Sequence, residues 1–71
     1  MTVLMEQFAH RLKYLRHKTG LTQIELAEQA KISVNFLRGL EQGRFSASFK
    51  TLESLAKALG VSVKDLFDFG G

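Results

Sequence analysis

The 71-residue sequence contains no cysteine, no proline and no tryptophan. Without cysteine, the chain can form neither a disulfide nor a thiolate metal site, and this absence fits the reducing environment of a cytoplasm. Without proline, no residue lacks the backbone N–H that a helix interior needs. Because alanine, leucine, glutamate, glutamine and lysine are abundant, the composition favours an all-α fold.

Long hydrophobic runs are absent as well, so no segment is long enough to span a membrane. Residues 1–5 are mildly apolar but lack the basic start and the extended apolar stretch of a secretory signal. Hydrophobic residues make up 45% of the chain, which is enough for a globular core, and 71 residues leave room for one domain. We therefore expect a single cytoplasmic domain over residues 1–71 with no membrane association.

Acidic residues are outnumbered, with 10 Lys and Arg against 7 Asp and Glu, which gives a formal charge of +3. This excess permits a nucleic-acid partner but is too small to establish one. Signs of catalysis are scarce: His10 and His17 can share a helix face, but no acid or thiol is placed to orient them. No glycine-rich phosphate loop or metal-spaced cluster occurs, so we expect no enzyme, cofactor, metal site or small-molecule ligand.

Glycine and hydroxyl residues divide the chain into five predicted helices. Three glycines follow apolar-periodic segments and are expected to end helices in the left-handed conformation: Gly20, Gly43 and Gly60. Four hydroxyl residues stand where helix N-caps are expected: Thr22, Ser33, Ser48 and Ser62. Thr22 is followed by Glu25, and Ser62 by Asp65, at the spacing of a capping box. The predicted helices cover about 5–19, 23–30, 34–42, 49–59 and 63–68.

Each predicted helix carries apolar residues at helical spacing, which we interpret as its core-facing stripe. The predicted core residues are Phe8, Leu12, Leu15, Leu26, Ala27, Ala30, Phe36, Leu37, Leu40, Leu52, Leu55, Ala56, Leu59, Val63, Leu66 and Phe67. Two charges share these stripes, Arg16 with the first helix and Glu41 with the third. A charge that faces a core requires a partner.

The second and third predicted helices are short and joined by only a few residues, an arrangement typical of a helix-turn-helix over about 22–42. Helical spacing turns Asn35, Arg38, Gly39 and Gln42 outward on the third helix. Asparagine can bond an adenine edge and arginine a guanine edge through two hydrogen bonds. Mid-helix Gly39 costs about 0.5–1 kcal/mol relative to alanine, so either the position tolerates glycine or backbone approaches something closely there.

Five sequence segments closely resemble the Cro/C1-type (XRE) helix-turn-helix family: 21–27 (LTQIELA), 32–33 (IS), 40–43 (LEQG), 51–52 (TL) and 55–61 (LAKALGV). The resemblance covers about residues 8–67. It implies a compact five-helix, lambda-repressor-like domain that binds double-stranded DNA, usually as a homodimer, in a cytoplasmic, nucleoid-associated transcriptional regulator. Among transcriptional regulators, the resemblance favours a repressor. The helix 34–42 would lie in the major groove.

The same resemblance assigns candidate site residues. It implies base contacts by Val34, Asn35 and Gly39, with Arg38 beside them. It implies contacts to the DNA backbone by Thr22, Gln23, Ser33, Arg44, Ser48 and Lys50, which would set register while the base contacts select sequence. Arg16 and Glu41 match positions that commonly form a buried ion pair between the first and third helices. Two departures stand out, because Lys31 occupies a usual glycine of the turn and Ala47 a usual proline of the following loop.

Three aromatic residues have no place in the predicted core: Phe45, Phe49 and Phe69. Phe67 and Phe69, at the end of the fifth predicted helix, match a region where dimer contacts are common in the family. The alternative function is that of an antitoxin or bridging protein, whose main role is to bind a toxin or another protein partner.

Overall fold

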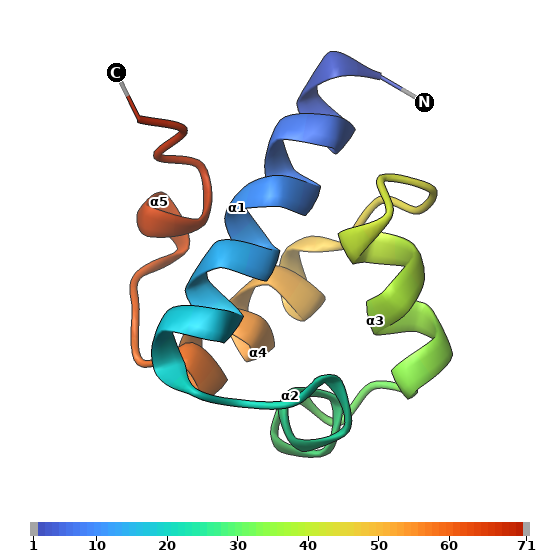
Figure 1. Ribbon diagram of the computed structural model, residues 1–71, viewed down its shortest axis with the longest axis vertical. Helices are drawn as coiled ribbons and strands as arrows, with labels where there is room; N and C mark the ends of the chain where they lie inside the picture. The colour runs from blue at the N-terminus through green and yellow to red at the C-terminus, as the bar shows by residue number, and fades with distance from the viewer. Residues whose placement is uncertain (1, 71) are drawn as a thin grey trace.

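The computed structural model describes residues 2–70, and among them it contains five α-helices and no strand (Figure 1). The helices are α1 (Val3–Thr19), α2 (Gln23–Ala30), α3 (Val34–Glu41), α4 (Phe49–Leu59) and α5 (Val63–Leu66). The all-α, five-helix prediction is confirmed. Residues 1 and 71, the ends of the domain expected over 1–71, lie outside the described residues.

Hydroxyl side chains start the helices as predicted. Each of the four predicted caps accepts a hydrogen bond from the backbone N–H three residues later: Thr22 from Glu25, Ser33 from Phe36, Ser48 from Thr51 and Ser62 from Asp65. Both predicted capping boxes are complete. The start of α1 was predicted too late, because Thr2 also acts as an N-cap and accepts from the N–H of Met5 at 3.0 Å.

Left-handed residues end α1, α2 and α4. Gly20 and Gly60 have φ values of 82° and 71° and close α1 and α4, as predicted, and Gly43 follows α3 with a φ of 74°. Lys31 ends α2 with a φ of 59° and is the sole non-glycine residue with positive φ in residues 2–70. The helix predicted over 63–68 ends earlier, because the backbone leaves the helical region at Phe67, where φ is −112°.

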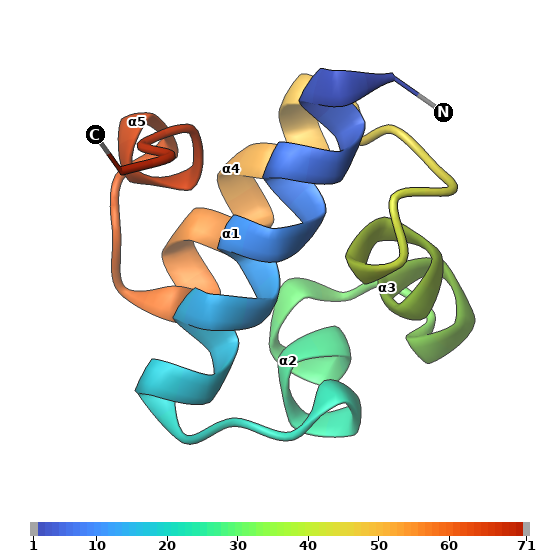
Figure 2. The ribbon, with the colours of Figure 1, turned by 45° about the horizontal axis from the view of Figure 1, so that its top comes forward.

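All five helices contribute to one core. Helix α2 packs against α4, and α1 packs against α3, α4 and α5, with α5 on the side of α1 opposite to α3 (Figure 2). Six leucines are completely buried: Leu12, Leu26, Leu37, Leu40, Leu55 and Leu66. A fully buried leucine contributes about 1.5–3 kcal/mol, so these residues dominate the stability. Three predicted core residues are less buried, since Phe36 and Val63 are half-buried and Phe67 is 37% exposed.

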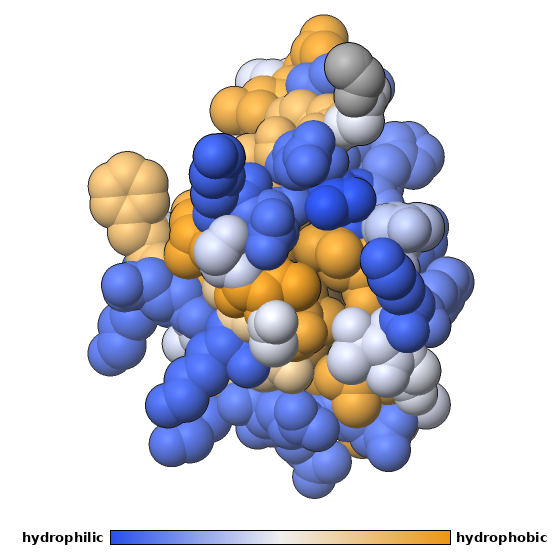
Figure 3. All heavy atoms as spheres, turned by 90° about the vertical axis from the view of Figure 1, so that its left-hand side faces the viewer, coloured by the Kyte–Doolittle hydropathy of each residue, from blue (hydrophilic) through white to orange (hydrophobic). Residues whose placement is uncertain are grey.

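Apolar side chains also reach the surface. On the face that carries α5 they lie in the middle, among polar side chains, and again at the top of the view (Figure 3). The large exposed hydrophobic residues among residues 2–70 are Val3, Leu4, Tyr14, Ile24, Phe45, Phe49 and Phe67. No helix within residues 2–70 has both the length and the apolar character needed to cross a membrane.

Candidate nucleic-acid interface

Helices α2 and α3 form a helix-turn-helix joined by Lys31, Ile32 and Ser33. The chain reverses tightly there, because the N–H of Ile32 donates to the carbonyl of Ala27 at 3.0 Å and Ser33 already caps α3. Helix α3 then lies at the edge of the molecule, with one side toward α1 and the other toward solvent (Figure 1). The joint therefore holds α3 with one complete face available.

The buried side of α3 is tied to α1 by Arg16 and Glu41, the two residues expected to pair. Arg16 Nε donates to Glu41 Oε2 at 2.7 Å, and Arg16 Nη2 donates to Glu41 Oε1 at 3.0 Å. The two residues are only 7% and 4% exposed, and Arg16 Nη1 also donates to the carbonyl of Leu21 at 3.0 Å. This two-bond geometry fixes the orientation of α3 against α1, and it satisfies both charges within the core.

A chain of polar contacts continues from this ion pair to the outer face of α3. Gln23 Nε2 donates to Glu41 Oε1 at 3.1 Å, and Arg38 Nε donates to Gln23 Oε1 at 3.3 Å. Arg38 Nη1 in turn lies 3.4 Å from Asn35 Oδ1. The side chains of Gln23, Arg38 and Asn35 are therefore held in a connected arrangement before any ligand binds.

The solvent face of α3 carries amide and guanidinium groups. Asn35, Arg38 and Gln42 are exposed and line a shallow hollow together with Arg44. The carboxylate of Glu41 is turned inward, so no acid lines this hollow in the described part of the chain. Val34, the fourth candidate base contact besides Asn35, Arg38 and Gly39, is half-buried at the border of this face. A face with two positive charges and several hydrogen-bond donors suits a polyanion.

Gly39 lies on the outward side of α3, as its helical spacing predicts, but it is not open to solvent. It is buried because the ring of Phe45 lies directly on it, and a Cβ atom at position 39 would overlap the ring carbons Cδ2 and Cε2. This contact explains why glycine stands in mid-helix, and it covers the Gly39 backbone to which the resemblance assigns a base contact. Two features of the sequence could have indicated this contact. Gly39 stands in the middle of a predicted helix, and Phe45 is an aromatic residue with no place in the predicted core.

The candidate contacts to the DNA backbone lie at helix starts and in the loop that follows α3. Thr22, Ser33 and Ser48 are exposed N-caps, and Arg44 and Lys50 are exposed basic side chains. Gln23 is half-buried, and one N–H of its amide group donates to Glu41 while the second has no partner among residues 2–70.

The fold lowers the pKa values of the carboxylates of the two capping boxes. The backbone N–H and the hydroxyl of Thr22 hold the pKa of Glu25 below its ordinary value. The corresponding groups of Ser62 hold the pKa of Asp65 below its ordinary value. In both cases hydrogen bonds stabilise the charged carboxylate at the start of a helix.

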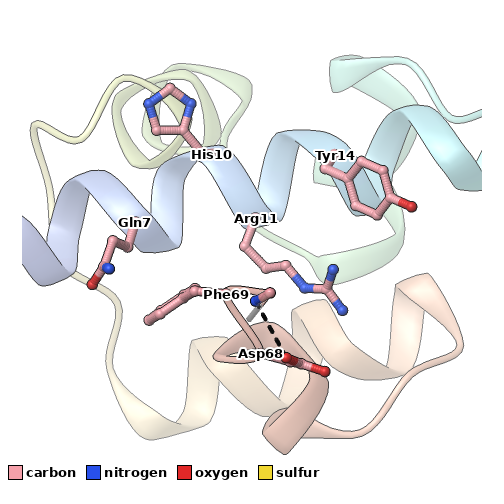
Figure 4. A pocket seen from close by; sticks show the side chains of 7 residues that line it. Gln7, His10, Arg11, Tyr14, Asp68 and Phe69 are labelled. Carbon is pink, nitrogen blue, oxygen red and sulfur yellow. Dashed lines mark hydrogen bonds between the residues drawn. The ribbon is translucent and has the colours of Figure 1, made fainter.

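The two aromatic residues assigned to a dimer contact pack partly against their own chain. The Phe67 ring stacks on Phe8 with centroids 5.4 Å apart, and Phe69 meets Phe67 edge-on at 6.1 Å. Phe69 and Asp68 also border a hollow whose other wall is formed by α1 (Figure 4). The α1 residues of that wall are Gln7, His10, Arg11 and Tyr14.

This hollow does not have the arrangement of a catalytic site. The carboxylate of Asp68 accepts from the N–H of Gly70 at 3.4 Å, and no hydrogen bond joins it to His10 within the described chain. His17 lies next to the Arg16 guanidinium, 3.1 Å from Nη2. No group of three or more metal-ligating side chains occurs in residues 2–70.

Five helices with a helix-turn-helix joint define the class of this protein as a helix-turn-helix domain. The chain belongs to that family, because the family model described as a helix-turn-helix domain matches residues 7–68. The predicted resemblance is thereby confirmed. Relatives of the chain are named as transcriptional regulators and as a repressor.

The chain is 42% identical over 62 residues to the HTH-type transcriptional regulator DdrOP3 of Deinococcus deserti. This alignment covers 87% of this chain and 48% of that protein. The chain is 43% identical over 53 residues to the immunity repressor protein of Bacillus phage phi105. This alignment covers 75% of this chain and 37% of the repressor. The chain therefore spans less than half the length of these two relatives.

A solved structure resembles most of the chain. The restriction-modification controller protein C.AhdI from Aeromonas hydrophila superimposes with a TM-score of 0.87 at 32% identity, over 89% of this chain and 96% of that one.

Proposed function

We propose that this chain binds double-stranded DNA sequence-specifically and acts in a transcriptional regulator, most simply as a repressor in the cytoplasm. The observation that carries the proposal is the solvent face of α3, where Asn35 and Arg38 are exposed and connected to each other and border a hollow that no acid of residues 2–70 lines. The relatives named as transcriptional regulators and repressors favour this function over that of an antitoxin or bridging protein.

In this proposal α3 enters the major groove, and Val34, Asn35 and Arg38 contact base edges. Six residues contact the DNA backbone: Thr22, Gln23, Ser33, Arg44, Ser48 and Lys50. The second amide N–H of Gln23 suits a phosphate oxygen, because Glu41 already fixes the orientation of that group. We further propose that residues 1–71 act as one binding unit and form a homodimer through the face that contains Phe67 and Phe69.

Selection of bound duplexes from a random pool, followed by a salt titration on the enriched duplex, tests the proposal. A dimer that contacts about 6–10 phosphates should lose about 10³–10⁵ in affinity between about 50 and 200 mM salt. Failure to enrich any duplex, or an affinity that salt does not change, contradicts DNA binding.

Two variants separate base contacts from phosphate contacts. Asn35→Ala should relax the preference at one base pair by about 1–3 kcal/mol. Lys50→Ala should weaken binding to all duplexes alike and reduce the salt slope by about one.

A further inference from the structure

The ring of Phe45 occupies the place where a side chain of residue 39 would project from α3. Its carbons Cδ2 and Cε2 lie so close to Gly39 that no Cβ atom fits between them. Gly39 is therefore the residue that allows a side chain from the following loop to cover the helix. The ring of Phe45, six residues further along the sequence, thus fills the outward position that a side chain of residue 39 would occupy.

Three neighbours hold this ring in place. Gly39 lies under one part of it, and Phe36 stacks against it with centroids 5.9 Å apart and an interplanar angle of 18°. The guanidinium carbon of Arg44 lies 5.5 Å from the Phe45 ring centroid. Phe45 nevertheless remains 41% exposed. The ring is thus positioned by the protein while part of it stays open to a ligand.

The open part of the ring borders the same hollow as the polar groups of α3. Asn35, Arg38, Gln42 and Arg44 line this hollow with Phe45. These four side chains offer amide and guanidinium groups, whereas Phe45 offers an apolar surface of fixed position. In the major groove, the C5-methyl of thymine is the group that an apolar side chain such as phenylalanine contacts.

We propose that Phe45 is a specificity-determining residue that reads a thymine methyl group in the major groove, in place of the side chain that Gly39 lacks. This proposal rests on the proposed DNA binding, and it extends the reading surface from α3 to the loop between α3 and α4. Because burial of one methyl-sized group corresponds to about 0.8 kcal/mol, the contact should change Kd about fourfold.

Replacement of thymine by uracil tests this directly, because the exchange removes the methyl group and keeps the base pair. The probe is the duplex that the unmodified protein enriches from a random pool, with each thymine replaced in turn. At one position of a half-site, uracil should weaken binding of the unmodified protein about fourfold. Phe45→Ala should bind the thymine and uracil duplexes equally, with the affinity of the unmodified protein for uracil.

Phe45→Leu keeps an apolar cover on Gly39 and should retain a smaller preference for thymine, so the test does not depend on the alanine variant alone. Phe49→Ala is the matched control, because Phe49 is 86% exposed on α4 and lines no part of the hollow beside α3. It should keep the full response to uracil.

Three results would overturn the proposal. The unmodified protein could respond to uracil at no position, the Phe45 variants could respond as the unmodified protein does, or Phe45→Ala could bind more tightly because the ring obstructs the groove. In each of these cases DNA binding itself stands. If no duplex is enriched at all, the proposed function fails and this proposal fails with it.

Discussion

The Glu41 carboxylate makes three hydrogen bonds at the boundary between the core and the candidate interface. It accepts two from Arg16 and one from Gln23, and it is 4% exposed. One side chain therefore has two roles, since it neutralises a buried guanidinium and orients an amide that points toward the proposed phosphate contact.

Glu41→Ala should lower the free energy of unfolding by about 3–5 kcal/mol, because it leaves the Arg16 charge buried and unpaired. Urea denaturation followed by circular dichroism measures this loss. Glu53→Ala, which removes an exposed acid from α4, should change stability by less than about 0.5 kcal/mol.

A double variant distinguishes lost pairing from lost packing. Arg16→Met combined with Glu41→Leu should be considerably more stable than either single loss of charge, because no charge remains buried. A loss in the double variant equal to the sum of the two single losses would show that the charges do not act as a pair.

Charged residues on apolar stripes are visible in the sequence, and this is why Arg16 and Glu41 could be predicted to need partners. The side chain of Gln23 could not be placed in the same way, because its bonds to Glu41 and Arg38 depend on how α2 and α3 meet. The Phe45 ring on Gly39 depends likewise on the path of an irregular loop.

At the scale of elements, the joint between α2 and α3 contains the helix cap that the sequence predicts at Ser33 and also a strained residue, Lys31. Hydroxyl caps and terminal glycines act within a few residues, so they predicted helix starts and ends well. Lys31, however, adopts the left-handed conformation that the family usually gives to glycine, with φ of 59°. A side chain at such a position costs about 1–2 kcal/mol.

Lys31→Gly should raise the free energy of unfolding by about 0.5–1 kcal/mol, because relief of strain exceeds the extra entropy of glycine in the unfolded chain. Thermal or urea unfolding measures the change. Lys57→Gly serves as the control within α4, where glycine should lower stability by about 1 kcal/mol. Destabilisation by both substitutions would refute the strain at Lys31.

The start of α2 should make stability depend on pH. Because the folded pKa of Glu25 is lowered by its bonds to Thr22, its contribution is present above the pKa of the unfolded chain and is lost as pH falls through the folded pKa. Stability should therefore fall on acidification below about pH 5, and Glu25→Gln should reduce that fall while keeping the capping box.

Unfolding curves collected at several acidic pH values check this expectation. Glu28→Gln, which removes an exposed carboxylate from α2 away from the cap, should leave the pH dependence unchanged. An equal effect of the two substitutions would indicate general charge effects instead of the cap.

At the scale of the whole molecule, the proposed dimer connects the face that carries α5 with the position of α3. Phe67 stacks on Phe8, and Arg11 Nε donates to the carbonyl of Asp65 at 2.8 Å, so residues 65–67 are held against α1. A dimer formed on this face would fix the distance between its two recognition helices.

Enriched duplexes should contain two half-sites whose centres lie about 34–36 Å apart, which is one turn of DNA. Insertion of about five base pairs between the half-sites should abolish tight binding, because it rotates one half-site to the opposite side of the duplex. Gel-shift titrations measure both duplexes. Equal affinity for one isolated half-site would contradict the dimer.

The close contact of Phe45 with Gly39 also limits how this domain can be re-engineered. A recognition helix transplanted from another regulator would bring a side chain to position 39, and that side chain would collide with the aromatic ring. Loop and helix must therefore be exchanged together. A graft that replaces residues 34–41 alone should misplace the loop, whereas one that also introduces a small residue at position 45 should fold.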